Sequence, residues 1–202
     1  YYKKTFNVIH NGYDEEDFSL VNKTENNNVV ISYIGTMTKS QNPLMFFESI
    51  YELNLKEKKY QIDLIGNIHP DIKYYIEAKK YDNFIKTKPY IPHKDAIKKM
   101  CESDFLLLVI PNTEKNKGII TGKLFEYIRS MRKIIMIGPP KSDAAKIIAQ
   151  TNSGRCFDYS EKNKIKQTLL KTNLPSSNNY QQYSRENLTK ILSHLFEEIE
   201  LK

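Results

Sequence analysis

The feature that most constrains the fold of this 202-residue chain is a set of four short runs of β-branched and other apolar residues. Such runs are typical of strands buried on both faces of a parallel sheet. Between them the apolar spacing changes to the helical period, so strands and helices are predicted to alternate. Strands are expected at 29–34, 60–65, 105–110 and 134–137, with weaker ones at 84–86 and 155–157, and helices at 43–55, 71–79, 94–102, 123–131 and 142–151. The pattern predicts the α/β class, with a doubly wound, mostly parallel six-stranded sheet of the Rossmann-like kind.

Two polar breaks divide the chain. The segment 22–28 precedes the first strand, and the segment 175–179 precedes a long amphipathic helix at 183–201. One face of this helix carries Leu188, Ile191, Leu192, Leu195 and Ile199. We therefore expect a leading segment (1–28), an α/β domain (29–174) and a C-terminal helix (175–202). Because the chain begins with Tyr1 rather than Met, we also expect it to be a fragment of a longer protein.

Composition argues against several classes of function. No apolar run is long enough to span a bilayer. The net charge is +7, but the lysines are spread along the chain beside acidic residues, which favours solvated helix faces over a nucleic-acid surface. The residues that most often bind metals or form disulfides are isolated: His10, His69, His93, His194, Cys101 and Cys156. Their spacing predicts reduced thiols and no metal site.

Glycine-bearing loops follow several of the predicted strands. Gly35-Thr36 follows the first strand, Gly66 follows the second, and Gly138 follows the strand at 134–137. Because the carboxyl ends of parallel strands share the edge at which open α/β folds bind ligands, we expect these loops to lie together at a ligand site. In the first loop Lys39 could hold a phosphate, but a plain strand-to-helix turn explains the same residues equally well.

The stretch 118–128 joins a polar, glycine-bearing loop to a helical apolar pattern. A helix that begins there presents free backbone N–H groups and a positive dipole end, both of which favour a phosphate. Lys123 follows Thr121 and Gly122 at the predicted helix start, and Glu126 lies about one turn further on. These residues predict a site for a diphosphate and the sugar hydroxyls of a nucleotide. The alternative is an ordinary amphipathic helix, with Glu126 in water and Thr121 or Gly122 as the N-cap.

The segment 89–94 is a third candidate, stiffened by two prolines. Its rigid backbone could read a nucleobase through N–H and C=O groups, although a structural turn is an equally good explanation. His93 is expected to cap or precede a helix and to lie on the surface rather than act as a catalyst. Spacing alone identifies no catalytic triad and no carboxylate pair, so catalytic residues stay unassigned.

Taken in order, these motifs resemble the C-terminal domain of GT-B retaining glycosyltransferases, in the broad group called family 4. The segment 8–14 is similar to the linker that leads into that domain, and Ile34-Gly35-Thr36 with Lys39 is similar to the first phosphate loop. The segments 64–66 and 90–96 resemble the strand and base-contact region, and 121–127 resembles the start of the donor-binding helix. The segments 137–140 and 151–154 follow as in polysaccharide-assembly members, so the resemblance covers roughly residues 6–160.

The resemblance implies one half of a GT-B fold, which binds a nucleotide diphosphate sugar without a metal or other cofactor. Glu126 would bind the ribose hydroxyls, and Lys39 would neutralise the diphosphate. Tyr90 and Ile91 would lie against the base. The full set of implied donor-binding residues is Gly35, Thr36, Lys39, Gly66, Tyr90, Ile91, Thr121, Gly122, Lys123 and Glu126. Of these, Thr121, Gly122 and Lys123 would contribute their backbone N–H groups to the phosphates.

The implied reaction transfers the sugar to an acceptor hydroxyl during the biosynthesis of a surface polysaccharide. A glycan or lipid-linked acceptor would bind to an N-terminal domain outside this sequence, toward which the C-terminal helix would return. The full-length protein is expected in the cytoplasm, with peripheral membrane association and no nucleic-acid partner. The isolated domain is expected to transfer no sugar.

Two positions depart from the pattern of the family. Gly118 stands eight positions before Glu126, where many members carry an earlier glutamate, and Thr36 stands where many carry arginine. Two alternatives therefore stay open at this point. One is a GT-B-shaped sugar-nucleotide epimerase, and the other is a non-catalytic nucleotide-binding module.

Overall fold

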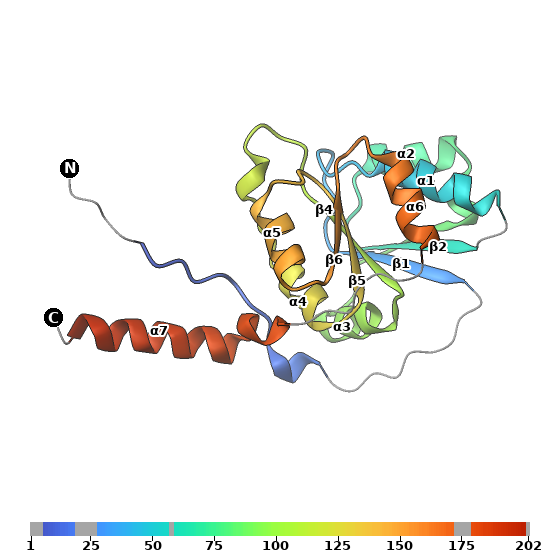
Figure 1. The fold of residues 1–202 in the computed structure, drawn as a ribbon. Helices are drawn as coiled ribbons and strands as arrows, with labels where there is room; N and C mark the ends of the chain where they lie inside the picture. The colour runs from blue at the N-terminus through green and yellow to red at the C-terminus, as the bar shows by residue number, and fades with distance from the viewer. Residues whose placement is uncertain (1–5, 19–27, 57–58, 172–178, 201–202) are drawn as a thin grey trace.

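The fold is built on a single six-stranded parallel sheet (Figure 1). The computed structural model describes residues 6–18, 28–56, 59–171 and 179–200. The strands are β1 (Val29–Ile34), β2 (Tyr60–Ile65), β3 (Ile85–Lys88), β4 (Phe105–Val109), β5 (Lys133–Ile137) and β6 (Gly154–Phe157). They lie in the order β3-β2-β1-β4-β5-β6, and every neighbouring pair is parallel. The predicted doubly wound α/β class is therefore confirmed, and the sheet is parallel throughout the described chain.

Helices cover both faces of this sheet. The α-helices are α1 (Leu44–Asn54), α2 (Pro70–Ala78), α3 (His93–Glu102), α4 (Lys123–Arg129), α5 (Asp143–Gln150), α6 (Lys162–Leu170) and α7 (Arg185–Glu200). Short 3-10 turns lie at η1 (Glu15–Asp17), η2 (Tyr81–Asn83), η3 (Asn116–Gly118) and η4 (Tyr180–Tyr183). Helices α1, α2 and α6 pack on one face, and α3, α4 and α5 pack on the other (Figure 1). Burial from both sides explains why the strands read as continuous apolar runs.

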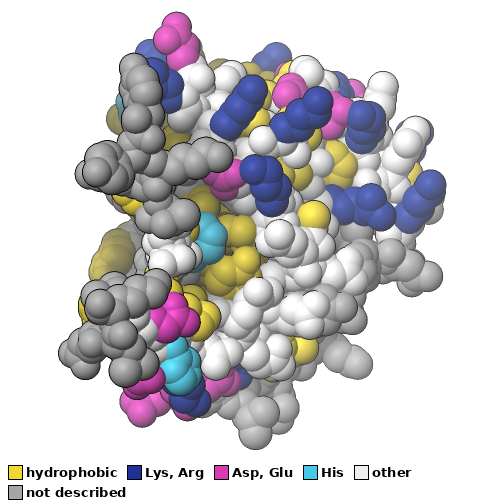
Figure 2. Space-filling view, turned by 60° about the vertical axis from the view of Figure 1, so that its left-hand side comes forward, with side chains coloured by type: hydrophobic (Ala, Val, Ile, Leu, Met, Phe, Trp, Pro, Cys, Tyr) yellow, Lys and Arg dark blue, Asp and Glu magenta, His cyan; other side chains and the backbone are white. Residues whose placement is uncertain are grey.

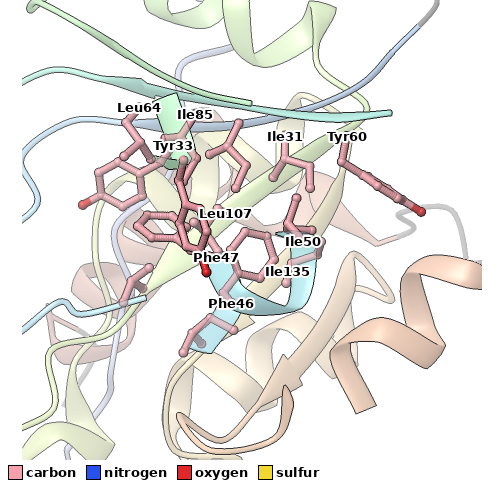
Figure 3. Packing of buried hydrophobic residues seen from close by; sticks show 14 of the residues in the cluster. Ile31, Tyr33, Phe46, Phe47, Ile50, Tyr60, Leu64, Ile85, Leu107 and Ile135 are labelled. Carbon is pink, nitrogen blue, oxygen red and sulfur yellow. The ribbon is translucent and has the colours of Figure 1, made fainter. Parts of the chain in front are cut away.

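The core on the first face is rich in aromatic residues. The side chains of Tyr33, Phe46 and Phe47 are fully buried and lie among aliphatic side chains of the sheet, including Leu64 and Leu107 (Figure 3). Burying a side chain of this size contributes about 1.5–3 kcal/mol to folding. This packing fixes β1, and with it the position of the loop that follows β1.

The prediction and the structure differ at two helices. The sequence pattern did not predict α6, because that helix is mostly polar and buries only Ile165 and Leu169 on one narrow face. The predicted helix 123–131 ends earlier, at Arg129, since Met131 has a left-handed backbone with φ of 58°. The predicted loop 22–28 and the predicted break 175–179 lie largely outside the described residues.

The leading segment lies beside the start of α7 and is joined to it by backbone hydrogen bonds. The Tyr13 amide donates to the Tyr183 carbonyl at 3.1 Å, and the Arg185 amide donates to the Tyr13 carbonyl at 2.9 Å. A Cβ on Gly12 would lie 2.3 Å from the Tyr183 carbonyl oxygen, so only glycine allows this approach. From this junction α7 extends away from the sheet (Figure 1). None of the helices in the described ranges has the length and apolar character needed to cross a bilayer.

Candidate functional site

A pocket of about 210 Å³ lies at the carboxyl edge of the sheet, over the ends of β1 and β2. Helices α3 and α4 and the β3–α3 loop form its walls. Its lining residues are Ile34, Gly35, Ile65, Gly66, Tyr90, Ile91, His93, Ala96, Met100, Lys123 and Glu126. The strand order reverses between β1 and β4, and open α/β folds bind ligands beside such a reversal. This position makes the pocket the candidate site.

The charge distribution on one face of the molecule is uneven (Figure 2). Hydrophobic side chains and a histidine line a hollow near the centre of that view, and Lys and Arg side chains gather to one side of it. A second and larger hollow, of about 500 Å³, lies along the outer strand β6 and α6. Its charged groups belong to the surface, and Lys164 there is already paired with Glu161. The smaller pocket is the one that contains buried charge.

Two glycines form the floor of the pocket. Gly35 and Gly66 both have φ of +121°, a backbone conformation that residues with a Cβ rarely adopt. A Cβ on Gly66 would lie 2.4 Å from the Gly35 carbonyl oxygen, and a Cβ on Gly35 would lie 2.8 Å from Lys123 Nζ. The two loops therefore touch each other through bare backbone, and Lys123 reaches across the first of them. Gly35 and Gly66 lie together, as the sequence predicted, whereas Gly138, which was expected at the same site, does not line this pocket.

Lys123 is the first residue of α4, and its ammonium group is partly buried in the pocket wall. Its Nζ donates to Tyr33 Oη at 3.1 Å and lies 4.2 Å from the centre of the Tyr33 ring. Burial lowers the pKa of Lys123 to about 8, and the nearby Glu126 carboxylate only partly opposes this effect. A lysine held this way is a cation whose charge is available at neutral pH and poorly solvated by water.

Glu126 lies one turn along α4 from Lys123, on the same side of the helix. Burial raises the pKa of the Glu126 carboxyl, and a charged His93 acts in the opposite direction. Among the described residues, none forms a hydrogen bond or ion pair with this carboxylate. A half-buried carboxylate without a partner is an acceptor for hydroxyl groups of a ligand.

His93 closes the pocket from the α3 side and is tied to the leading segment. Its Nε2 lies 3.0 Å from Asp17 Oδ2, and Asp17 belongs to η1. The hydrogen bond to Asp17 raises the pKa of His93 above its usual value. His93 is largely exposed, as predicted from sequence, yet it also lines the pocket. Sequence patterns gave no signal for the Asp17 contact, since the two residues are 76 positions apart.

The first loop does not direct all of its predicted residues into the pocket. Lys39 Nζ forms an ion pair with Asp71 Oδ2 at 2.9 Å and is exposed at a separate hollow beside α2. The Thr36 carbonyl accepts a hydrogen bond from Tyr33 Oη at 2.5 Å. Neither residue lines the 210 Å³ pocket. The roles predicted for Lys39 and Thr36 stay predictions.

The residues before α4 lie close to the leading segment. A Cβ on Gly122 would lie 3.4 Å from Asn11 Nδ2. The Thr121 hydroxyl is buried without a hydrogen-bond partner among the described residues. Tyr90 is exposed at the pocket rim, and Ile91 lies beside it. Within the described chain, no three His, Cys, Asp or Glu side chains are placed to hold a metal ion together.

The structural comparisons identify the fold. No family profile matches this sequence, and no curated protein is similar to it in sequence. Sucrose-phosphate synthase from Thermosynechococcus elongatus superposes with a TM-score of 0.75 at 11% identity, covering 96% of this chain and 53% of that protein. The C-terminal domain of a glycosyl transferase group 1 family protein from Francisella tularensis gives 0.58 at 16%, covering 79% and 87%.

A third solved protein of the same fold is the pneumococcal O-GlcNAc transferase, determined in complex with UDP and GlcNAc. It gives a TM-score of 0.60 at 15% identity, covering 85% of this chain and 36% of that protein. The chain thus spans about half the length of the sucrose-phosphate synthase it matches. At these identities the likeness shows the fold: this chain has the fold of the C-terminal half of a GT-B glycosyltransferase.

Proposed function

We propose that this chain is the donor-binding domain of a glycosyltransferase and that the pocket holds a nucleotide diphosphate sugar. The observation that carries the proposal is the pair on α4: the largely desolvated ammonium of Lys123 and, one turn on, the carboxylate of Glu126, which accepts no hydrogen bond from the described residues. A cation and a hydrogen-bond acceptor at this spacing suit a diphosphate next to a ribose. The GT-B fold adds independent support.

Each part of the donor has a partner of suitable chemistry in the pocket. Glu126 accepts hydrogen bonds from the ribose hydroxyls, and Lys123 lies against the diphosphate. The exposed ring of Tyr90 and the side chain of Ile91 cover the base. During transfer the bond from the sugar to the diphosphate breaks, and negative charge grows on the leaving oxygen. A fixed cation in a partly dry site stabilises that charge, which is the electrostatic form of catalysis.

The acceptor would bind to another domain of a longer protein, against which α7 packs. In the apolar stripe predicted for this helix, Ile191 is 48% accessible and Leu192 40%, whereas Leu188 and Leu195 are half-buried. Phe196, outside that stripe, is 58% accessible. An apolar stripe of this kind on a helix that extends from the domain suits an interface with a further domain. The assignment of the acceptor as a glycan or lipid-linked sugar of a surface polysaccharide rests on the sequence resemblance.

Isothermal calorimetry with UDP and GDP tests the proposal on this domain. Glu126→Gln keeps the shape of the side chain and removes its charge, so we expect affinity for the preferred nucleotide to fall about tenfold, as for loss of charge-assisted hydrogen bonds. Glu77→Gln is the matched control, because Glu77 is exposed on α2 away from the pocket. No heat with either nucleotide, or equal affinities for the two variants, would refute the site.

A further inference from the structure

The hydroxyl of Tyr33 joins three parts of the molecule that the donor site depends on. Tyr33 is fully buried in β1, two residues before Gly35. Its Oη donates to the Thr36 carbonyl at 2.5 Å and accepts from Lys123 Nζ at 3.1 Å. Gln41 Nε2 lies 3.4 Å from the same oxygen as a second donor. A phenol has one proton and two lone pairs, so this hydroxyl is fully used.

Gln41 extends the network into the loop and the neighbouring strand. It is buried, its Nε2 donates to the Val109 carbonyl at 3.0 Å, and its Oε1 accepts from the Thr38 amide at 3.0 Å. Residues 36–41 are thereby tied to the end of β4 and to Tyr33. The network connects the first loop, two central strands and α4 through buried hydrogen bonds, which hold geometry more firmly than exposed ones.

We propose that Tyr33 is a positioning residue that holds the Lys123 ammonium beside Gly35, where the diphosphate of a donor would lie. The inference rests on the proposed function and adds to it the residue that holds the Lys123 ammonium in position. Lysine has a long flexible stem, and an unrestrained ammonium would turn out into water. The Tyr33 ring lies 4.2 Å away and its hydroxyl accepts a hydrogen bond, so both the face and the edge of the ring hold the ammonium in place.

Folding alone does not require this contact. The Thr36 carbonyl already satisfies the hydroxyl proton of Tyr33, as a buried tyrosine needs. Burying an ammonium group is unfavourable, and a hydrophobic side chain at position 123 would pack against the ring without that cost. The contact between Tyr33 and Lys123 is therefore explained by the use of the cation rather than by stability.

The test compares Tyr33→Phe with Tyr60→Phe in calorimetric titrations with UDP from pH 6 to pH 10. Tyr60 is the matched control, because its hydroxyl is also buried, donates to the Leu169 carbonyl at 3.1 Å and lies at the start of β2, the opposite edge of the sheet. We expect Tyr33→Phe to weaken UDP binding about fivefold at pH 7. We also expect the pH at which binding declines to move downward, because the ammonium loses its acceptor.

Other titratable groups line the same pocket, namely Glu126, Tyr90 and His93 with its partner Asp17. Lys123→Met separates their contribution, since the decline above neutral pH should be missing in that variant. If Tyr33→Phe does not fold, Gln41→Met loosens the same loop while leaving the hydroxyl in place. It should weaken UDP binding about threefold without moving the pH of the decline.

The outcomes are distinguishable. If Tyr33→Phe and Tyr60→Phe had the same affinity for UDP and the same pH profile, the positioning role of Tyr33 would be refuted. The proposed donor site would stay intact. Unchanged affinity in Gln41→Met would overturn the positioning role as well. If Lys123→Met bound UDP with the affinity of the wild type, the contact between Lys123 and the diphosphate would be refuted, and the inference with it. A downward shift in Tyr33→Phe alone supports the assignment.

Discussion

Replacing Lys123 with methionine should make the folded chain more stable at pH 7, although it removes a charged residue from the site. Burial lowers the pKa of Lys123 from 10.5 to about 8 in the folded chain. Each pH unit between the folded and unfolded pKa values corresponds to about 1.4 kcal/mol, so keeping this ammonium buried costs about 3 kcal/mol of stability. The variant also loses the hydrogen bond to Tyr33, which lowers its stability by about 1 kcal/mol. The net gain in stability of Lys123→Met is therefore about 2 kcal/mol.

The gain depends on pH in a defined direction. Between pH 8 and pH 10.5 the unfolded chain binds a proton at Lys123 that the folded chain has released. The stability of the wild-type chain therefore rises with pH across this window because of Lys123. The cost is complete below pH 8 and is lost above pH 10.5. The free energy of unfolding of Lys123→Met should exceed that of the wild type by about 2 kcal/mol at pH 7 and should not exceed it near pH 10.5.

Urea denaturation followed by circular dichroism at both pH values measures the difference. Taking the variant minus the wild type cancels the other groups that titrate in alkali. Lys146→Met is the matched control, because Lys146 is exposed on α5 and its one ion pair within the described ranges is with Asp143, so its effect should stay within about 0.5 kcal/mol. A Lys123→Met chain that is less stable at pH 7, or that gains equally at both pH values, would show that the ammonium is not desolvated as argued.

Two further predictions concern the floor and the rim of the pocket. Gly66→Ala should destabilise the fold by about 2–4 kcal/mol in urea, since its φ is +121° and a Cβ would lie 2.4 Å from the Gly35 carbonyl oxygen. Gly118→Ala, where a Cβ meets only an atom at 4.0 Å, should change stability little by comparison. Asp17→Asn should lower the pKa of His93 in an NMR titration, because the hydrogen bond that His93 donates to the Asp17 carboxylate raises it. The stability that this pair provides is present at acidic pH and is lost as His93 deprotonates. Because both side chains are exposed, this contribution should be under about 1 kcal/mol. An unchanged His93 titration would contradict the assigned contact.

Much of the fold was predictable because its signals are local. A strand buried on both faces needs an unbroken apolar run, and 29–34 and 60–65 were predicted with the bounds that the structure has. Parallel strands bring their carboxyl ends to one edge, so the glycines after β1 and β2 were expected to meet there. Helix α6 was missed for the opposite reason: it buries only Ile165 and Leu169, and most of its other positions are polar.

The site was predictable only in part. Sequence patterns identified Lys123, Glu126 and the two glycines as neighbours of one ligand, and the structure places all four at one pocket. The same patterns directed Lys39 to the diphosphate, whereas the structure pairs it with Asp71 outside that pocket. A loop lysine has several rotamers of similar energy, and the choice among them depends on charges that come from other elements.

The sequence by itself determined the alternation of strands and helices along the chain, apart from α6, as well as the parallel sheet and the edge at which a ligand would bind. These follow from the period of apolar residues and from glycines that allow left-handed backbone, which neighbouring positions specify. Only the tertiary structure decided that Tyr33 holds Lys123, 90 positions away, and that Asp17 meets His93. The physical reason is that desolvation and hydrogen-bond geometry depend on which faces pack together, and packing brings together residues whose separation in sequence carries no periodic signal.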